Sequence, residues 1–162
     1  MKDFTHINKS GNPHIVDIGK KKETLRVAIA KGTVKMKPET LEQIKLKTFK
    51  KGDVLSVAQL SGIMATKLTS QIIPLCHPIS IEHVDVNIEI NDKENSIEIT
   101  SECKVSGKTG VEMEALTSVT TTALTIYDMC KSIDKTIYIN NIHLHYKSGG
   151  KSGIYNAKKW VN

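Results

Sequence analysis

Two stretches of alternating apolar and polar residues, 84–90 and 97–105, constrain the fold of this chain more than any other feature. Every second residue is apolar in both stretches, apart from Ser101, and the polar segment NDKEN (91–95) separates them. A period of two is typical of a strand with one buried face, so the pair predicts an antiparallel hairpin. A sheet with one buried face needs a second layer to cover that face.

Helical segments precede the hairpin and can supply that layer. Pro38 fits the first turn of a helix through residues 39–49, which Gly52 then ends. Asp53 is the predicted N-cap of a second helix over residues 54–68. The Ala, Ser and Gly content of this second helix predicts close packing against another helix or a second subunit.

Further elements flank these. A short strand is predicted at residues 24–30, a third helix over 111–133, and a strand or strand pair at 136–146. Strands, a helix and another strand, preceded by helices, indicate an α+β fold in which helices cover one face of an antiparallel sheet. We expect a ferredoxin-like arrangement.

Length and composition indicate one soluble domain. The chain has 162 residues, 39% of them hydrophobic and 25% charged. Residues 1–13 are expected to be a flexible lead-in to a single domain over residues 14–162. The first residues lack the apolar core of a secretory signal and no apolar run is long enough to span a membrane, so a cytoplasmic protein is expected. Cys76, Cys103 and Cys130 lack the spacing of a disulfide framework or a metal site.

The net charge of +6 points to an anionic partner. Cations are spread along the chain, and Lys20–Lys22 form the one lysine run, so a phosphate-bearing small molecule and a nucleic acid both remain possible. Single-stranded nucleic acids are usually bound on aromatic side chains, and only 4% of this chain is aromatic. Nucleic acid is therefore the less favoured partner.

The stretch IIPLCHP, Ile72 to Pro78, places a cysteine and a histidine between two prolines. Pro74 and Pro78 remove backbone donors and restrict the residues before them, which predicts a stiff, extended loop. Such a loop can present Cys76 and His77 to a ligand. The alternative is a buried turn in which Cys76 is a small core residue and His77 is satisfied by one backbone partner.

The third predicted helix carries unusual acidic residues. Thr109 and Glu112 have the spacing of a capping box, which by itself would explain both residues. Glu114 lies about 200° around the helix from Glu112, so the two carboxylates cannot act as a simple acid and base pair.

Asp128 and Lys131 lie near the end of the same helix, spaced i, i+3, and can be an ordinary ion pair or a catalytic pair. Asp128 is about 21 Å along the helix axis from Glu114. A site that uses both residues needs a second subunit or a long ligand.

The glycine-rich segment KSGGKSG, residues 147–153, combines flexible backbone with Lys147 and Lys151. Backbone amides and lysines of this kind can bind phosphate, although the segment is not a P-loop and could instead be a solvated tail. Lys51, at a helix end, and Lys67, just before the Pro-bounded loop, are further candidate cations.

Three long stretches, in this order and spacing, closely resemble the cyclic pyranopterin monophosphate synthase family, MoaC, of molybdenum cofactor biosynthesis. They are KGDVLSVAQLSGIMATKLTSQIIPLCHP (51–78), KTGVEMEALTSVTTTALTIYDMCK (108–131) and KSGGKSG (147–153). The start HIVDIGKKKETLRVAIAKG (14–32) is also similar to that of the family, and Arg26 falls at its characteristic arginine.

The resemblance implies a lyase that converts a cyclic dihydroguanosine triphosphate, supplied by a radical SAM enzyme, to cyclic pyranopterin monophosphate with release of diphosphate. It also implies a hexamer, a trimer of dimers, with the active site at the dimer interface. No metal ligands on the protein are implied and no cofactor is expected, although Mg²⁺ could accompany the substrate phosphates.

The resemblance also implies roles for individual residues. Asp128 would be catalytic, with Lys51 and Lys131 assisting it. Leu75, Cys76, His77, Met113 and Glu114 would contact the substrate, and Glu112 is a further candidate contact. The chemistry of the reaction adds four cations that could neutralise the leaving diphosphate: Arg26, Lys67, Lys147 and Lys151.

Two other classes of protein stay open at this point. One is a non-enzymatic module for phosphate or RNA, which the net charge favours and the scarcity of aromatic residues disfavours. The other is a structural oligomer in which Asp128 and Lys131 only pack subunits together.

Overall fold

The computed structural model describes residues 5–49 and 52–158. Its centre is a five-stranded antiparallel sheet in the order β2-β3-β1-β4-β5. The strands are β1 (Thr24–Lys35), β2 (His83–Asn91), β3 (Ser96–Gly107), β4 (Tyr138–Ser148) and β5 (Tyr155–Asn156), and the helices are α1 (Pro38–Lys45), α2 (Val54–Thr66), α3 (Thr69–Ile72) and α4 (Glu112–Cys130).

The predicted hairpin is confirmed as β2 and β3, and the structure explains its polar exception. Val86 pairs with Ser101 in the register of the two strands, and both side chains lie on the buried face. The Ser101 hydroxyl donates to the Ser118 hydroxyl of α4 at 2.9 Å. A buried polar group that finds a partner costs little, so Ser101 is tolerated in the core.

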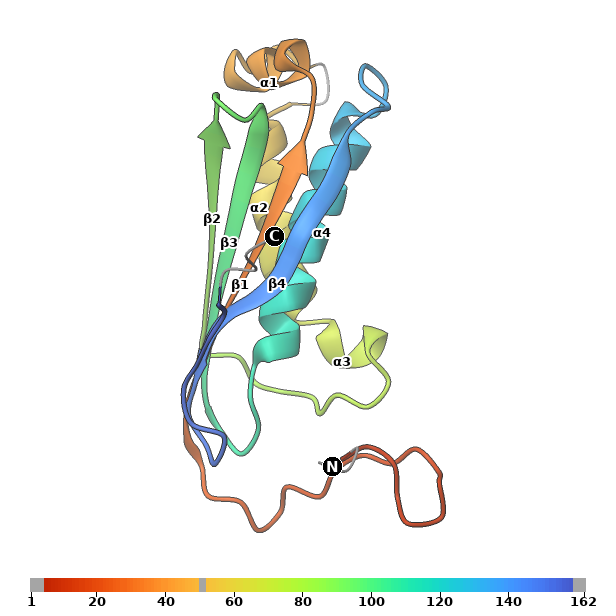
Figure 1. The fold of residues 1–162 in the computed structure, drawn as a ribbon, viewed down its shortest axis with the longest axis vertical. Helices are drawn as coiled ribbons and strands as arrows, with labels where there is room; N and C mark the ends of the chain where they lie inside the picture. Colours follow the sequence, from red (N-terminus) through yellow and green to blue (C-terminus); the bar gives the residue numbers. More distant parts are fainter. Residues whose placement is uncertain (1–4, 50–51, 159–162) are drawn as a thin grey trace.

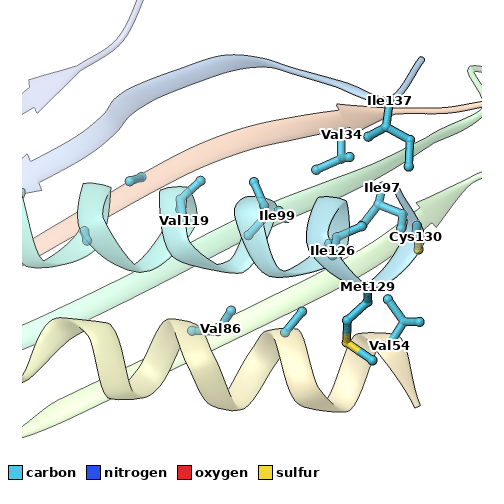
Figure 2. Packing of buried hydrophobic residues seen from close by; sticks show 14 of the residues in the cluster. Val34, Val54, Val86, Ile97, Ile99, Val119, Ile126, Met129, Cys130 and Ile137 are labelled. Carbon is cyan, nitrogen blue, oxygen red and sulfur yellow. The ribbon is translucent and has the colours of Figure 1, made fainter. Parts of the chain in front are cut away.

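Helices α2 and α4 lie side by side against one face of the sheet, and α1 lies at one end of it (Figure 1). The predicted α+β, ferredoxin-like arrangement with helices on one face is confirmed. Apolar side chains of α4, α2 and the inner sheet face form a continuous core, part of which Figure 2 shows. Its members include Val34, Val54, Val86, Ile97, Ile99, Val119, Ile126, Met129, Cys130 and Ile137.

The second predicted helix, α2, packs closely against α4. A Cβ atom added at Gly62 would overlap the hydroxyl oxygen of Thr122. Next to Gly62, the hydroxyl of Ser61 is 2.8 Å from the hydroxyl of Thr125, about one turn after Thr122 in α4, and the two share a hydrogen bond. Small residues therefore bring the two helices into close contact, with polar side chains paired between them.

The helix starts were predicted better than the helix ends. Pro38 opens α1 as expected, and the Asp53 carboxylate accepts from the backbone N–H of Ser56 at 3.2 Å as the N-cap of α2. The first helix is shorter than predicted and ends at Lys45, because Lys47 takes a left-handed conformation with φ 54°.

The third helix is also shorter than predicted, since α4 ends at Cys130. Residues 131–134 form a turn in which the N–H groups of Ile133 and Asp134 both bond to the Cys130 carbonyl. Strand β1 is longer than predicted and reaches Lys35.

The candidate site residues lie at the two opposite ends of the sheet. The start of β1 pairs with the end of β3 (Thr24 with Gly107) and lies beside the end of β4 (Val27 with Ser148). Since α4 follows β3, its first turn lies at this end of the sheet, and its last turn lies at the other end (Figure 1).

Residues 5–23 precede the sheet without regular secondary structure, apart from an isolated bridge between Ile7 and Pro13. None of the helices in the described part of the chain is long and apolar enough to cross a membrane.

Candidate active site

A basic pocket of about 790 Å³ opens where β1 begins and β4 ends. Among the described residues, seven cationic side chains and one carboxylate line it. A pocket with this charge attracts a polyanion such as a di- or triphosphate. The charged residues are Lys20, Lys21, Lys22, Arg26, Lys108, Lys147, Lys151 and Glu112.

Arg26 is fixed in this basic pocket by its surroundings. Its Nε donates to the carbonyl of Gly107 at 3.2 Å. Gly149 and Gly150 have φ values of 97° and 70°, which favour glycine, and a Cβ atom at Gly150 would overlap the Arg26 guanidinium. The glycine pair of KSGGKSG therefore lets the backbone pack directly against Arg26.

Lys147 and Glu112 form an ion pair of 2.8 Å on one wall of the basic pocket, with each side chain about one quarter exposed. The capping box predicted for Thr109 and Glu112 is wrong. Residue Val111 is the N-cap of α4, no side chain caps the helix, and the Glu112 carboxylate is bound to Lys147 instead. Glu112 thus joins the helix to the end of β4.

Glu114, in the first turn of α4, is a buried carboxyl with only 3% of its surface exposed. Burial, and then the negative charge of Glu112, raise its pKa to about 7. A carboxyl with this pKa can give up or take a proton near neutral pH. Met113, beside it, is half-buried.

The Pro-bounded loop lies near the first turn of α4. Burial raises the pKa of the Cys76 thiol, and the charge of Glu114 raises it further. Ile73, before Pro74, is extended as predicted, but the backbone then makes a turn in which the Cys76 N–H bonds to the Ile73 carbonyl at 3.1 Å. The prediction of an extended loop is therefore wrong where the chain turns, at residues 74 and 75.

His77 has a backbone partner from a distant part of the chain. Its Nε2 lies 2.8 Å from the carbonyl oxygen of Val16. Leu75, Cys76 and His77 are all partly buried. The structure brings the loop to the end of the sheet that holds the basic pocket, without making these three residues part of its lining.

Lys67 lies apart from the other predicted phosphate ligands. It is the C-cap of α2 and lines a second pocket of about 440 Å³ with residues 79–84. The structure of one chain therefore brings Arg26, Lys147 and Lys151 together but leaves Lys67 outside their pocket.

Asp128 and Lys131 form the predicted contact at the other end of α4. The Lys131 Nζ donates to the Asp128 Oδ1 at 2.5 Å, and this hydrogen bond raises the pKa of Lys131. Both side chains are exposed in the chain, at 63% and 52%. Asp128 is about 24 Å along the helix axis from Glu112. Lys51 lies outside the described residues.

Sequence reasoning missed part of the pocket lining. Lys108 and the run Lys20–Lys22 line the basic pocket but were not among the predicted site residues. The lysine run could have indicated this part of the pocket, because three consecutive cations just before a strand can contact a ligand that binds at the start of that strand.

No group of three or more His, Cys, Asp or Glu side chains in the described part of the chain is arranged to hold a metal ion. The donors around the basic pocket are ammonium and guanidinium groups, which suit phosphate oxygens and not a cation. The participation of Mg²⁺ bound to substrate phosphates stays a prediction.

Comparisons of the sequence with known proteins point to one family. A model of the MoaC family matches residues 15–150. The cyclic pyranopterin monophosphate synthase of Clostridium botulinum is 54% identical, over 94% of this chain and 96% of its own length. That of Clostridium acetobutylicum is 55% identical, over 94% of both chains. That of Desulforapulum autotrophicum is 49% identical, over 99% of this chain and 98% of its own length.

Proposed function

Because the chain belongs to the MoaC family, we propose that its basic pocket and the first turn of α4 form one half of a synthase active site. The chain is an enzyme that converts a cyclic dihydroguanosine triphosphate to cyclic pyranopterin monophosphate and releases diphosphate. The observation that carries the assignment of this site is the pocket itself, in which seven cationic side chains gather around Glu112, in the first turn of α4.

The basic pocket suits the triphosphate. Formation of the cyclic phosphate requires a sugar hydroxyl to attack the innermost phosphorus while diphosphate leaves. Arg26, Lys147 and Lys151 stabilise the charge that grows on the leaving group, because fixed cations act strongly on charge in a partly enclosed site. Lys67 joins this group only if another part of the assembly brings it to the phosphates.

The first turn of α4 suits the purine ring of the substrate. Conversion of a purine ring to a pterin requires repeated proton transfers, and Glu114 can exchange protons near neutral pH. We place Met113 and the Pro-bounded loop, with Leu75, Cys76 and His77, around the same part of the substrate.

A second subunit completes the site in this proposal. Asp128 and Lys131 are exposed at the far end of α4, where they cannot reach a ligand bound next to Glu112 of the same chain. Exposed apolar side chains on α2, at Val57, Leu60 and Met64, support contact with another subunit. We propose that Asp128, Lys131 and Lys51 of a second copy meet the basic pocket, within a hexamer built as a trimer of dimers.

We also propose the source of the substrate, the accompanying metal ion and the cell compartment. The substrate comes from a separate radical SAM enzyme, and Mg²⁺ can enter with its phosphates. The three cysteines are free thiols, which suits the reducing cytoplasm.

Replacement of Asp128 by Asn and of Lys131 by Ala tests the catalytic assignment. We expect turnover to fall about 10²-fold or more in each variant, the usual scale for loss of a positioned acid or base. We expect little change in the melting temperature of the chain, because exposed ion pairs contribute little to stability. Product formation and thermal unfolding are measured on the same samples.

Glu42→Gln is the matched control, because Glu42 and Lys45 form an i, i+3 ion pair on α1, at 3.1 Å. This variant should retain turnover. Normal turnover in Asp128→Asn or Lys131→Ala would remove that residue from the catalytic set.

A further inference from the structure

Residues 14–22, which we call the N-terminal strap, are held to the rest of the chain at two points. The Nε2 of His77 lies 2.8 Å from the Val16 carbonyl oxygen, and because a carbonyl only accepts, Nε2 carries the donated proton. The Nζ of Lys108 donates to the Gly19 carbonyl at 3.2 Å. The segment that carries the strap runs beneath the sheet end and the Pro-bounded loop (Figure 1).

The strap ends in the lysine run that lines the basic pocket. After the second attachment point, the N–H of Lys21 bonds to the Ile18 carbonyl at 3.1 Å, and the N–H of Gly19 bonds to the Asp17 carboxylate at 2.8 Å. These bonds set the direction in which the chain continues. Lys20, Lys21 and Lys22 then line the pocket together with Lys147 and Lys151.

The strap connects His77 to the basic pocket. His77 does not line this pocket, and its Nε2 bonds to a backbone oxygen of the strap. Lys108 lines the pocket and also holds the strap, so it joins the two features.

We propose that His77 and Lys108 are positioning residues that hold the N-terminal strap so that Lys20–Lys22 face a bound di- or triphosphate group. The ligand class rests on the proposed function, whereas the attachment of the strap does not. A lysine run on a loose segment loses conformational freedom when it binds an anion, and attachment at Val16 and Gly19 removes part of that cost in advance. His77 thus strengthens anion binding without touching the anion.

Binding of inorganic diphosphate, measured by calorimetry, tests this in His77→Asn and His77→Gln. The shorter Asn side chain cannot reach Val16, whereas the Gln amide nitrogen occupies nearly the place of Nε2. We expect His77→Asn to weaken diphosphate binding about three- to tenfold, the scale of one net hydrogen bond, and His77→Gln to restore most of it. Amide exchange at Lys21 should be faster in His77→Asn only.

A double-mutant cycle separates action through the strap from any other effect. Neutralisation of Lys20, Lys21 and Lys22 to Gln should weaken diphosphate binding, and His77→Asn added to it should cause no further loss. A variant with Lys37, Lys93 and Lys135 changed to Gln removes three lysines that do not line the pocket and controls for net charge.

The possible failures are distinct. Diphosphate binding that is lost in Arg26→Met but unchanged in His77→Asn would overturn the role of the strap and leave the proposed function intact. An additive loss in the cycle would also overturn it. Absence of diphosphate binding by the unaltered protein would count against the proposed function and the ligand named here. If His77→Asn does not fold, His77→Phe, which keeps a ring but has no donor for the Val16 carbonyl, replaces it in the same cycle.

Discussion

At the scale of single residues, Glu114 makes the stability of the chain depend on pH. Its pKa is raised from 4.5 to about 7 by burial and by the charge of Glu112. Between these values the folded chain keeps a proton that the unfolded chain has lost. Its contribution to stability is therefore complete below pH 4.5 and is lost as the pH rises to about 7, by roughly 3 kcal/mol in total.

Glu114→Gln should abolish this dependence. The neutral amide loses no proton, so the variant should gain roughly 2–3 kcal/mol of unfolding free energy relative to the unaltered chain between pH 5 and pH 8. Denaturant unfolding at the two pH values measures the difference. Glu39→Gln, in the first turn of α1 and exposed, is the control and should show no such gain. An equal response of the two variants would show that Glu114 is not held protonated by burial.

At the scale of elements, the contact between α2 and α4 depends on Gly62. In an exposed helix, Ala in place of Gly stabilises by about 1 kcal/mol. Here the new Cβ would overlap the Thr122 hydroxyl, so we expect Gly62→Ala to destabilise the chain by about 1–3 kcal/mol. Denaturant unfolding of the variant and of the unaltered chain shows whether Gly62→Ala lowers or raises the free energy of unfolding.

Thr122→Ala provides the second arm of a cycle, because it removes the atom that the new Cβ would meet. The double variant should lose less stability than the sum of the two single variants. A stabilising Gly62→Ala, or strict additivity, would mean that the helices are not in close contact at this point.

The same elements show what sequence reasoning can reach. The hairpin was predictable because alternation at residues 84–90 and 97–105 directly reports one buried face. Helix starts were predictable because Pro38 and Asp53 are local signals. The end of α1 was not, because the left-handed turn at Lys47 has no glycine to mark it.

The site was only partly predictable for a similar physical reason. Arg26, Lys147 and Lys151 could be named from the resemblance, but their meeting depends on the pairing of β1 with β4, which no local pattern reports. The contact of Glu112 with Lys147 depends on the same pairing, and it replaced the capping box that the local sequence favoured. Lys108 and the strap were missed because their bonds join residues that are distant in sequence.

At the scale of the whole molecule, one chain keeps the two sets of candidate residues apart. Arg26 lies in the basic pocket near the first turn of α4, and Asp128 lies in its last turns. In the proposed assembly, one active site takes these two residues from different copies of the chain. Two variants, Arg26→Met and Asp128→Asn, each inactive alone and each correctly assembled, can therefore complement one another.

The most direct measurement is the turnover of mixed assemblies, prepared by co-expression of the two variants with different tags. In a two-fold dimer with two composite sites, a mixed pair has one site with both defects and one site with neither, so an equal mixture should recover about one quarter of full activity. Recovery near that level, with mixed pairs verified by the tags, is the predicted result. Turnover no higher than that of either variant alone, despite verified mixed pairs, would contradict the account and place both residues in the site of a single chain.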